Sequence, residues 1–178
     1  MALDEVIKSS AEPPRDLGVL LIDMQPTFLE KLDLYKSRQM INYQSKVLDY
    51  CVEQDLPVFV LEFLGCGKTI RSLSRKMSPL KRIKKITKRN DDGFKKTSLA
   101  ADLSVEGIRT VMLMGVYASY CIRDTAIGAI DNGFDITTSR MLIADPFSLE
   151  HEFKESIKWY KEYGQYNDNY AKLLKGNN

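Results

Sequence analysis

The chain has 178 residues, of which 44% are hydrophobic and 28% charged, and its formal net charge at pH 7 is +2. These values are typical of a soluble globular domain large enough to bury a substantial core. The sequence shows no apolar run near the roughly 20 residues that span a bilayer and no secretory leader, so we expect a cytoplasmic protein with no membrane partner.

Three cysteines and one histidine narrow the kinds of site that this chain can hold. Cys51, Cys66 and Cys121 are odd in number and widely spaced, which argues against a disulfide framework or a zinc cluster and indicates a reducing compartment. A single histidine, His151, excludes a metal site built from several histidines, and its surroundings predict a solvated helix residue rather than a catalytic base. We therefore expect neither a metal nor another cofactor.

Apolar runs and helical periodicities alternate along the chain after a polar N-terminal arm at residues 1–15. Strands are expected at residues 17–23, 57–63, 86–88 and 109–114 and within 134–143. Helices are expected at residues 37–55, 69–77, 97–105, 119–132 and 150–162. This order predicts one domain over residues 1–178, with three α/β/α layers around a doubly wound, mainly parallel sheet.

Reactive side chains recur where the predicted strands end. Asp23, Glu62 and Lys88 each close a strand, and Cys121 follows the strand at 109–114 through a glycine turn. Ligands bind at the carboxyl ends of the strands in sheets of this kind. The sequence therefore predicts that these four residues lie near one site.

Cys121 has two interpretations. It begins a predicted helix, where unpaired N–H groups and a partial positive charge stabilise a thiolate, yet a free cysteine is also a common small core residue. A thiol with a pKa of about 8.5 needs a base or a cation to act as a nucleophile. Asp23 could accept its proton if burial raises the pKa of that carboxyl, and Lys88 could lower the pKa of the thiol.

Three segments, in order, resemble the isochorismatase-like cysteine hydrolases, a family that includes nicotinamidases and N-carbamoylsarcosine amidases. Residues 20–28 (LLIDMQPTF) look like the family's opening strand, and residues 88–94 (KRNDDGF) match the spacing of its lysine segment. Residues 115–135 (GVYASYCIRDTAIGAIDNGFD) are similar to its nucleophile segment. The resemblance covers roughly residues 17–143 and implies the same α/β fold.

The resemblance also implies roles for single residues. Cys121 would be the nucleophile, Asp23 the general acid/base and Lys88 the neighbouring cation. A cis peptide bond is implied between Val116 and Tyr117, with the backbone N–H groups of Tyr117 and Cys121 as oxyanion donors. In that mechanism the thiolate attacks an amide carbonyl, and the aspartate protonates the leaving amine before it activates water against the thioester.

Some positions depart from the family pattern. Residues 61–68 (LEFLGCGK) lack the histidines of the nicotinamidase metal motif, which makes a metal-dependent nicotinamidase a less favoured reading. Isochorismatases proper lack the nucleophilic cysteine, so Cys121 argues against vinyl-ether hydrolysis. Asp92 and Gly93, next to Asp91, replace small residues; these carboxylates either change the polarity of the pocket or cap a turn, and the turn is favoured.

Five residues are candidates for substrate contact: Gln25, Phe28, Glu62, Tyr117 and Tyr120. The first two either line the pocket or pack within a loop. Glu62 could orient the nearby lysine, receive a cationic group of the substrate, or pair with surface lysines. One of the two tyrosines is expected to face the pocket, and the other to lie in the core or in an interface.

Two further segments bear on partners. Residues 68–96 contain 12 basic and 2 acidic side chains, but no nucleic-acid motif and few aromatics accompany them, so a solvated face or a rim that steers an anionic substrate is favoured over nucleic-acid binding. Residues 159–166 (WYKEYGQY) are unusually aromatic and predict a subunit contact in a homo-oligomer, with core packing as the alternative.

The leading hypothesis is metal-independent hydrolysis of a small amide or related C–N bond through a thioester, with a small-molecule substrate. The alternative is a non-catalytic homologue that uses the same pocket, or residues 68–96, as an interaction surface. The two hypotheses differ in what they predict for Cys121: a catalyst predicts a thiol with a lowered pKa, and a binding protein predicts an ordinary thiol.

Overall fold

The structure is a computed structural model that describes residues 14–174. Within this range seven strands form one sheet, whose hydrogen-bonded order is β3-β2-β1-β4-β5-β7, with β6 paired to β4. The neighbouring strands are parallel in each pair. The strands are β1 (Leu17–Ile22), β2 (Val58–Phe63), β3 (Ile83–Lys88), β4 (Thr110–Val116), β5 (Asp135–Thr138), β6 (Ile143–Ala144) and β7 (Gln165–Tyr166).

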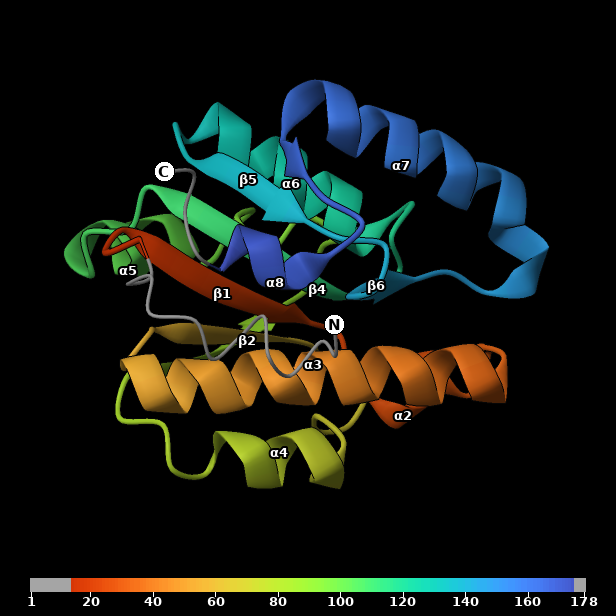
Figure 1. Ribbon diagram of the computed structural model, residues 1–178, viewed down its shortest axis with the longest axis horizontal. Coiled ribbons are helices and arrows are strands. Elements are labelled where there is room, and N and C mark those ends of the chain that lie inside the picture. Colours follow the sequence, from red (N-terminus) through yellow and green to blue (C-terminus); the bar gives the residue numbers. More distant parts are fainter. Residues whose placement is uncertain (1–13, 175–178) are drawn as a thin grey trace.

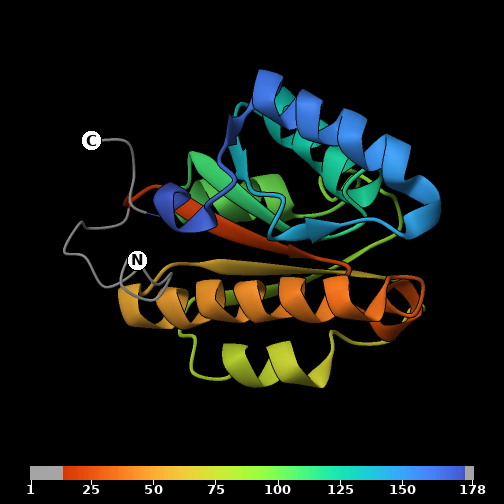
Figure 2. The same ribbon diagram turned by 45° about the vertical axis from the view of Figure 1, so that its right-hand side comes forward.

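Helices cover both faces of the sheet. Helices α3 and α4 lie on one face and α6 and α7 on the other (Figures 1 and 2). No helix within residues 14–174 combines the length and the apolar character needed to cross a membrane. The helices are α2 (Pro26–Leu29), α3 (Leu34–Gln54), α4 (Arg71–Met77), α5 (Leu99–Val105), α6 (Cys121–Asp131), α7 (Glu150–Tyr163) and α8 (Tyr170–Leu173), with a 3-10 turn at Phe147–Leu149. The predicted three-layer, doubly wound class is therefore confirmed.

The central strands are buried because their sequences are apolar on both faces. Every residue of β1 is buried, and β4 is buried from Val111 onward. A strand of this kind must be covered by a helix layer on each side, which is the usual setting of a parallel sheet. β1 and β4 accordingly pair with each other in the interior of the sheet.

The order of the strands brings the predicted site residues to one edge. β1 pairs with β2 on one side and with β4 on the other, so the chain reverses its direction of winding between β1 and β4. Such a switch point opens a crevice beyond the carboxyl ends of the strands. Asp23 follows β1 and Cys121 follows β4 at this point, while Lys88 ends β3 opposite Phe63 of β2.

β3 differs most from its prediction. Six residues, rather than three, form this strand, and the first three of them, Ile83–Lys85, are exposed. β3 lies at the edge of the sheet, where exposed lysines prevent pairing with another chain. Because an exposed edge strand carries few apolar residues, only its buried end, near Ile86, gave a signal in the sequence.

Several basic side chains of residues 68–96 are paired at the surface. Lys76 contacts Asp49, and Lys84 contacts Asp102. Arg82 forms a further ion pair with Glu106. Part of this basic segment is thus paired with neighbouring carboxylates, and its role as a solvated face or a steering rim stays a prediction.

Several short elements were not predicted. α2 and α8 have four residues each, and β7 has two. Periodicity cannot be read from segments of this length. The predicted N-terminal arm at residues 1–15 lies almost wholly outside the described residues.

A substitution at Gly115 tests how closely β1 and β4 approach each other. Its φ is +140°, and a Cβ atom there would lie 2.0 Å from the carbonyl oxygen of Ile22. We expect Gly115→Ala to lower the free energy of unfolding by more than about 4 kcal/mol, or to prevent folding, because neither backbone can move away.

Gly133→Ala is the matched control, since Gly133 has a φ of +83° with no atom within 4 Å of the added Cβ. Only backbone strain acts there, so a loss of about 1 kcal/mol is expected in urea unfolding. Equal losses for the two variants would contradict the close approach of the strands.

Candidate active site

Asp23, Lys88 and Cys121, which we call the Cys121 site, come together as predicted from the ends of three strands. Lys88 Nζ lies 2.7 Å from Asp23 Oδ2, and both side chains are fully buried. Cys121 is 6% exposed, and its thiol lies close enough to Asp23 for each group to shift the pKa of the other. A nucleophile, a carboxylate and a cation thus form one buried cluster.

Asp23 is held in an unusual position directly after β1. Its φ is +53°, a left-handed conformation that aspartate tolerates better than most residues. Its N–H donates to the carbonyl of Leu61 at 3.0 Å, and its own carbonyl accepts the N–H of Gln25 at 2.7 Å. The tight turn directs the carboxylate toward the crevice instead of along the strand.

Within the described residues, the Asp23 carboxylate is in contact with the Lys88 ammonium group and lies beside the Cys121 thiol. Compensation of the charge therefore comes from the ion pair with Lys88. Burial raises the pKa of the Asp23 carboxyl, while the lysine acts in the opposite direction. The result is a carboxylate that accepts a proton more readily than a solvated one.

Lys88 reaches this position across β2, which separates β3 from β1. Two strand spacings are roughly 10 Å, a span that a lysine and an aspartate can bridge together. Lys88 Nζ also donates to the carbonyls of Asn90 at 3.1 Å and Asp91 at 3.4 Å, and lies 4.5 Å from the centre of the Phe63 ring. These contacts fix the ammonium group beside the carboxylate.

Cys121 is the first residue of α6, where the helix leaves backbone N–H groups unpaired. The N–H groups of Tyr117 and Cys121 donate to no partner within residues 14–174. The peptide bond between Val116 and Tyr117 is cis. Two free donors beside a thiol are the arrangement that an oxyanion requires.

The thiol is not activated at rest. Burial raises the pKa of the Cys121 thiol well above its usual range, and the charge on Asp23 raises it further, while Lys88 lowers it in part. The depressed pKa that the sequence suggested for a catalyst is therefore not found in the free protein. The physical reason is that desolvation outweighs the single nearby cation.

Asp91 contacts the nucleophile, so for this carboxylate the structure supports the effect on pocket polarity that the sequence left open but did not favour. Its Oδ1 lies 3.5 Å from Cys121 Sγ. The loop is held against α6 because Thr125 donates its hydroxyl to the carbonyl of Asp91 at 3.3 Å and accepts the N–H of Gly93 at 2.9 Å. The neighbouring Asp92 accepts the N–H of Phe94 at 2.8 Å, so this carboxylate caps a turn as favoured from the sequence.

Three aromatic rings pack together beside the site. Phe28 packs edge to face on Phe63 and on Tyr117, with ring centres 6.2 Å and 5.9 Å apart. The Tyr117 hydroxyl donates to the carbonyl of Phe28 at 2.9 Å. All three rings are partly exposed, whereas Tyr120 is 46% exposed at the start of α6.

Two of the five substrate-contact candidates instead brace loops. The Gln25 amide donates to the carbonyls of Phe63 and Gly67 and accepts the Phe63 N–H, so its hydrogen bonds are used within the fold. Glu62 accepts both the N–H and the hydroxyl of Thr69, at 2.8 Å and 2.9 Å. The polar atoms of Gln25 are therefore used within the fold, whereas Glu62 uses only its Oε1 for both contacts.

The aromatic segment at 159–166 is divided between core and surface. Tyr160 is buried and donates its hydroxyl to the carbonyl of Ala118 at 2.7 Å, which braces the turn before Cys121. Trp159 stacks on Tyr163, whose side chain is 55% exposed. Core packing therefore accounts for one of these rings, and the predicted subunit contact stays a prediction.

Some chemically notable residues lie away from the site. His151 is exposed in α7, as expected for a solvated helix residue. Cys66 is half-buried in the loop after β2, and Cys51 is buried in α3. Among residues 14–174, no group of three or more His, Cys, Asp or Glu side chains is arranged to hold a metal ion.

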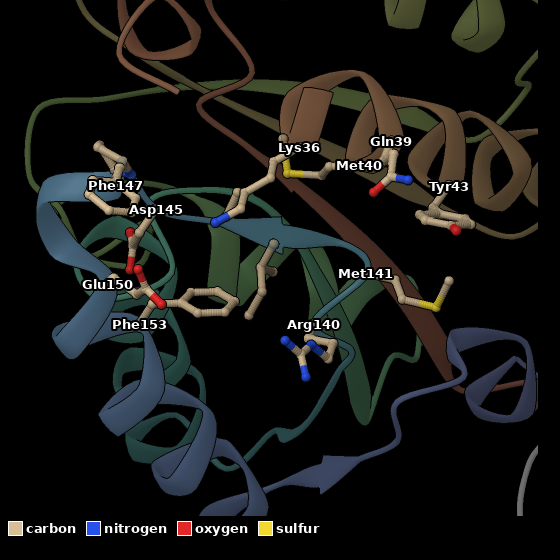
Figure 3. A pocket seen from close by; sticks show the side chains of 13 residues that line it. Lys36, Gln39, Met40, Tyr43, Arg140, Met141, Asp145, Phe147, Glu150 and Phe153 are labelled. Atoms are coloured by element: carbon tan, nitrogen blue, oxygen red, sulfur yellow. The ribbon is translucent and has the colours of Figure 1, made fainter. Parts of the chain in front are cut away.

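A separate hollow of about 340 Å³ lies between α3, β6 and the start of α7 (Figure 3). The carboxylates of Asp145 and Glu150 gather on one side of it, and Arg140 lies on the other. Asp145 accepts the N–H of Ser119 at 3.1 Å, which links this wall to the turn before Cys121. None of the three residues of the Cys121 site lines this hollow.

Comparisons with known proteins identify the family and the fold of this chain. A family model described as the isochorismatase domain matches residues 18–154. Maleamate amidohydrolase from Pseudomonas putida is 37% identical over 67 residues, which is 38% of this chain and 32% of that protein. The match thus spans about a third of the length of that relative.

Two solved structures show the same fold. The nicotinamidase from Staphylococcus aureus superposes with a TM-score of 0.77 at 17% identity, covering 86% of this chain and 99% of that one. N-carbamoylsarcosine amidase from Thermoplasma acidophilum gives a TM-score of 0.72 at 19% identity, covering 86% and 96%. Since the family model spans well over half of the 178 residues, this protein belongs to the isochorismatase-like hydrolase family, as its sequence resemblance predicted.

Proposed function

We propose that this protein is a metal-independent cysteine hydrolase that cleaves a small amide or related C–N bond through a thioester intermediate. The observation that carries this proposal is the buried Asp23–Lys88 ion pair next to the Cys121 thiol. A fully buried ion pair adds little to stability on its own account, so its position beside a thiol favours a chemical role.

The proton moves within the site without a change of net charge. At rest Lys88 is positive, Asp23 negative and Cys121 neutral; after transfer the lysine still faces one anion, now the thiolate. The raised pKa of Asp23 makes it the better acceptor for the thiol proton. Lys88 compensates the negative charge in both states, which lowers the cost of the transfer in a buried cleft.

The thiolate then attacks the carbonyl carbon of the amide. The oxyanion that forms accepts hydrogen bonds from the free N–H groups of Tyr117 and Cys121. As the C–N bond breaks, protonated Asp23 gives its proton to the leaving nitrogen, and an acyl thioester remains on Cys121. Asp23, again ionised, takes a proton from water, and the hydroxide breaks the C–S bond.

The names of the similar proteins support the class of bond. One is an amidohydrolase, one a nicotinamidase and one an N-carbamoylsarcosine amidase. All three names describe cleavage of a carbon–nitrogen bond outside a peptide chain. The absence of further histidines in the sequence argues for a mechanism that uses the thiol and the carboxylate instead of a multi-histidine metal site.

Replacement of the nucleophile and the base tests the proposed chemistry. On a panel of small primary amides, we expect Cys121→Ala to abolish ammonia release and Asp23→Asn to reduce kcat about 10²- to 10⁴-fold. Cys66→Ser removes a half-buried thiol outside the site and serves as the control with unchanged turnover. Ammonia is measured enzymatically under saturating substrate.

The thioester is tested in the same assay by adding hydroxylamine, which converts an acyl-enzyme to a hydroxamate. Hydroxamate formation that depends on Cys121 supports the covalent route. Ammonia release that survives Cys121→Ala would contradict it. Lack of turnover with every amide tried, together with an unreactive Cys121, would favour the non-catalytic homologue.

Removal of the lysine tests the ion pair through stability. We expect Lys88→Met to lower the free energy of unfolding at pH 7 by about 3–5 kcal/mol, because it leaves a buried carboxylate without its counterion. The pKa of Asp23 in the folded variant then lies further above its unfolded value of 3.8. The folded variant then binds the Asp23 proton more tightly than the unfolded chain does. The free energy of unfolding is therefore retained below about pH 4 and falls as the pH rises toward 7.

In the wild type, the contribution of Asp23 to the free energy of unfolding also falls as the pH rises, but less steeply, because Lys88 opposes the effect of burial on the pKa of Asp23. Lys76→Met is the control, because its ion pair with Asp49 is about half exposed and such pairs contribute under about 1 kcal/mol. Urea unfolding between pH 4 and 7 measures both variants. A pH-independent loss for Lys88→Met would refute the coupling between the two buried charges.

A further inference from the structure

The turn at residues 117–121, which joins β4 to α6, uses its backbone N–H groups selectively. The Ala118 N–H donates to the last carbonyl of β6 at 3.1 Å, and the Tyr120 N–H donates to the first carbonyl of the turn at 3.2 Å. The Ser119 N–H donates to the Asp145 carboxylate, with 3.1 Å and 3.3 Å to its two oxygens. The three middle N–H groups are thus occupied, whereas the first and the last, the proposed oxyanion donors, have no partner within residues 14–174.

The peptide group between Ala118 and Ser119 is held at both of its polar ends. Its carbonyl accepts the hydroxyl of Tyr160 at 2.7 Å, and its N–H is the one bound by Asp145. Tyr160 belongs to α7, and Asp145 directly follows β6, so two separate elements hold one peptide plane. Because the peptide group is planar and rigid, fixing its carbonyl and its N–H fixes its rotation about the chain.

Both contacts are suited to hold this geometry. Ala118, Ser119 and Tyr160 are buried, so water cannot readily replace the hydrogen bond between them. Asp145 is half-buried and lines the hollow of Figure 3, and no ion pair among residues 14–174 includes it. Burial raises the pKa of the Asp145 carboxyl, and hydrogen bonds from the turn oppose this effect. An ionised acceptor binds an N–H more strongly than a neutral one.

The orientation of this peptide group decides where the proposed oxyanion donors point. The Tyr117 N–H lies one residue before the group, and the Cys121 N–H lies two residues after it. Rotation of the plane changes the backbone angles on both sides, so it moves the two donors relative to each other. Donors stabilise an oxyanion only within hydrogen-bond distance of its position in the transition state. The two contacts therefore act on the donors, although neither side chain belongs to the Cys121 site.

Building on the proposed function, we propose that Asp145 and Tyr160 are positioning residues that lock the Ala118–Ser119 peptide group, so that the two free N–H groups of the turn converge on one oxyanion. Neither side chain touches the substrate. Loss of either contact lets the peptide plane rotate, which weakens stabilisation of the oxyanion. The thiol, at the start of α6, keeps its place. Support of this kind, from residues behind the reacting groups, is what holds a site in its productive geometry.

Two probes of the same thiol separate the oxyanion donors from the nucleophile. With propanal, the Cys121 sulfur adds to the carbonyl carbon and the thiol proton ends on the oxygen, so a hemithioacetal forms that uses the oxyanion donors. Propanal labelled with ¹³C at the carbonyl carbon gives the dissociation constant by NMR, from the adduct signal that Cys121→Ala lacks. With methyl methanethiosulfonate, the thiolate attacks sulfur and displaces methanesulfinate, so a mixed disulfide forms without an oxyanion on carbon. Mass spectrometry of peptides gives that rate at Cys121.

We expect Asp145→Ala and Tyr160→Phe each to raise the dissociation constant of the propanal adduct about tenfold or more, and to change the rate of disulfide formation less than about threefold. Asp145→Asn retains an oxygen that can accept the Ser119 N–H, so it should recover most of the affinity. Since both side chains hold one peptide group, the double variant of Asp145→Ala and Tyr160→Phe should lose little more than the weaker single variant.

Two controls remove the same kinds of hydrogen bond elsewhere. Tyr50→Phe deletes a buried hydroxyl that donates to the carbonyl of Leu174 at 3.4 Å. Asp33→Ala deletes a carboxylate that accepts the Lys36 N–H at 2.8 Å, at the start of α3. Both should bind propanal like the wild type. An unchanged dissociation constant in Asp145→Ala and in Tyr160→Phe would overturn the proposal, and so would equal losses of adduct and of disulfide formation.

Amide turnover separates this inference from the hydrolase itself. For any amide that the wild type hydrolyses, we expect both variants to lower kcat about 10- to 100-fold and to change KM less than about threefold. Cys121-dependent hydrolysis with kcat unchanged in both variants would overturn this inference alone. A propanal adduct that depends on Asp145 and Tyr160, without hydrolysis of any amide, would uphold the positioning role and count against the hydrolase. A wild type that forms no adduct would overturn the inference.

Discussion

The ion pair between Asp23 and Lys88 is the constraint on which the arrangement of the site depends. Both side chains are fully buried, and a buried charge of either sign alone would be strongly destabilising. The pair can form only if β3 lies two strands from β1 in the correct register, with β2 between them. The order of the strands and the chemistry of the site are therefore specified together.

The state of Cys121 follows from this arrangement. The thiol is buried beside two carboxylates and one cation, and burial, with the charge on Asp23, favours its neutral form in the free protein. A reactive thiolate exposed to solvent is open to oxidation, whereas a neutral buried thiol is largely protected. The site thus combines the groups for nucleophilic attack with a resting state in which attack is suppressed.

The fold and the placement of the three central residues could be predicted from the sequence. Continuous apolar strands make a parallel sheet, and parallel strands bring Asp23, Lys88 and Cys121 to one edge whatever the lengths of the connecting loops. Asp91 could not be placed, because its contact depends on a loop conformation that Thr125 holds from a distant helix. Contacts made by loops need long-range hydrogen bonds that no local pattern encodes.

The location of Lys88 on β3 has a consequence for the dynamics of the site. β3 is the edge strand, paired on one side only, and its first half is exposed to solvent. Edge elements with few buried contacts open by local fluctuations below the free energy of global unfolding. Opening of β3 would withdraw the ammonium group while β1 and β4 stay folded, so the electrostatic balance of the site would be lost before the fold. Amide hydrogen exchange along Ile83–Lys88 therefore reports directly on how long the site remains assembled.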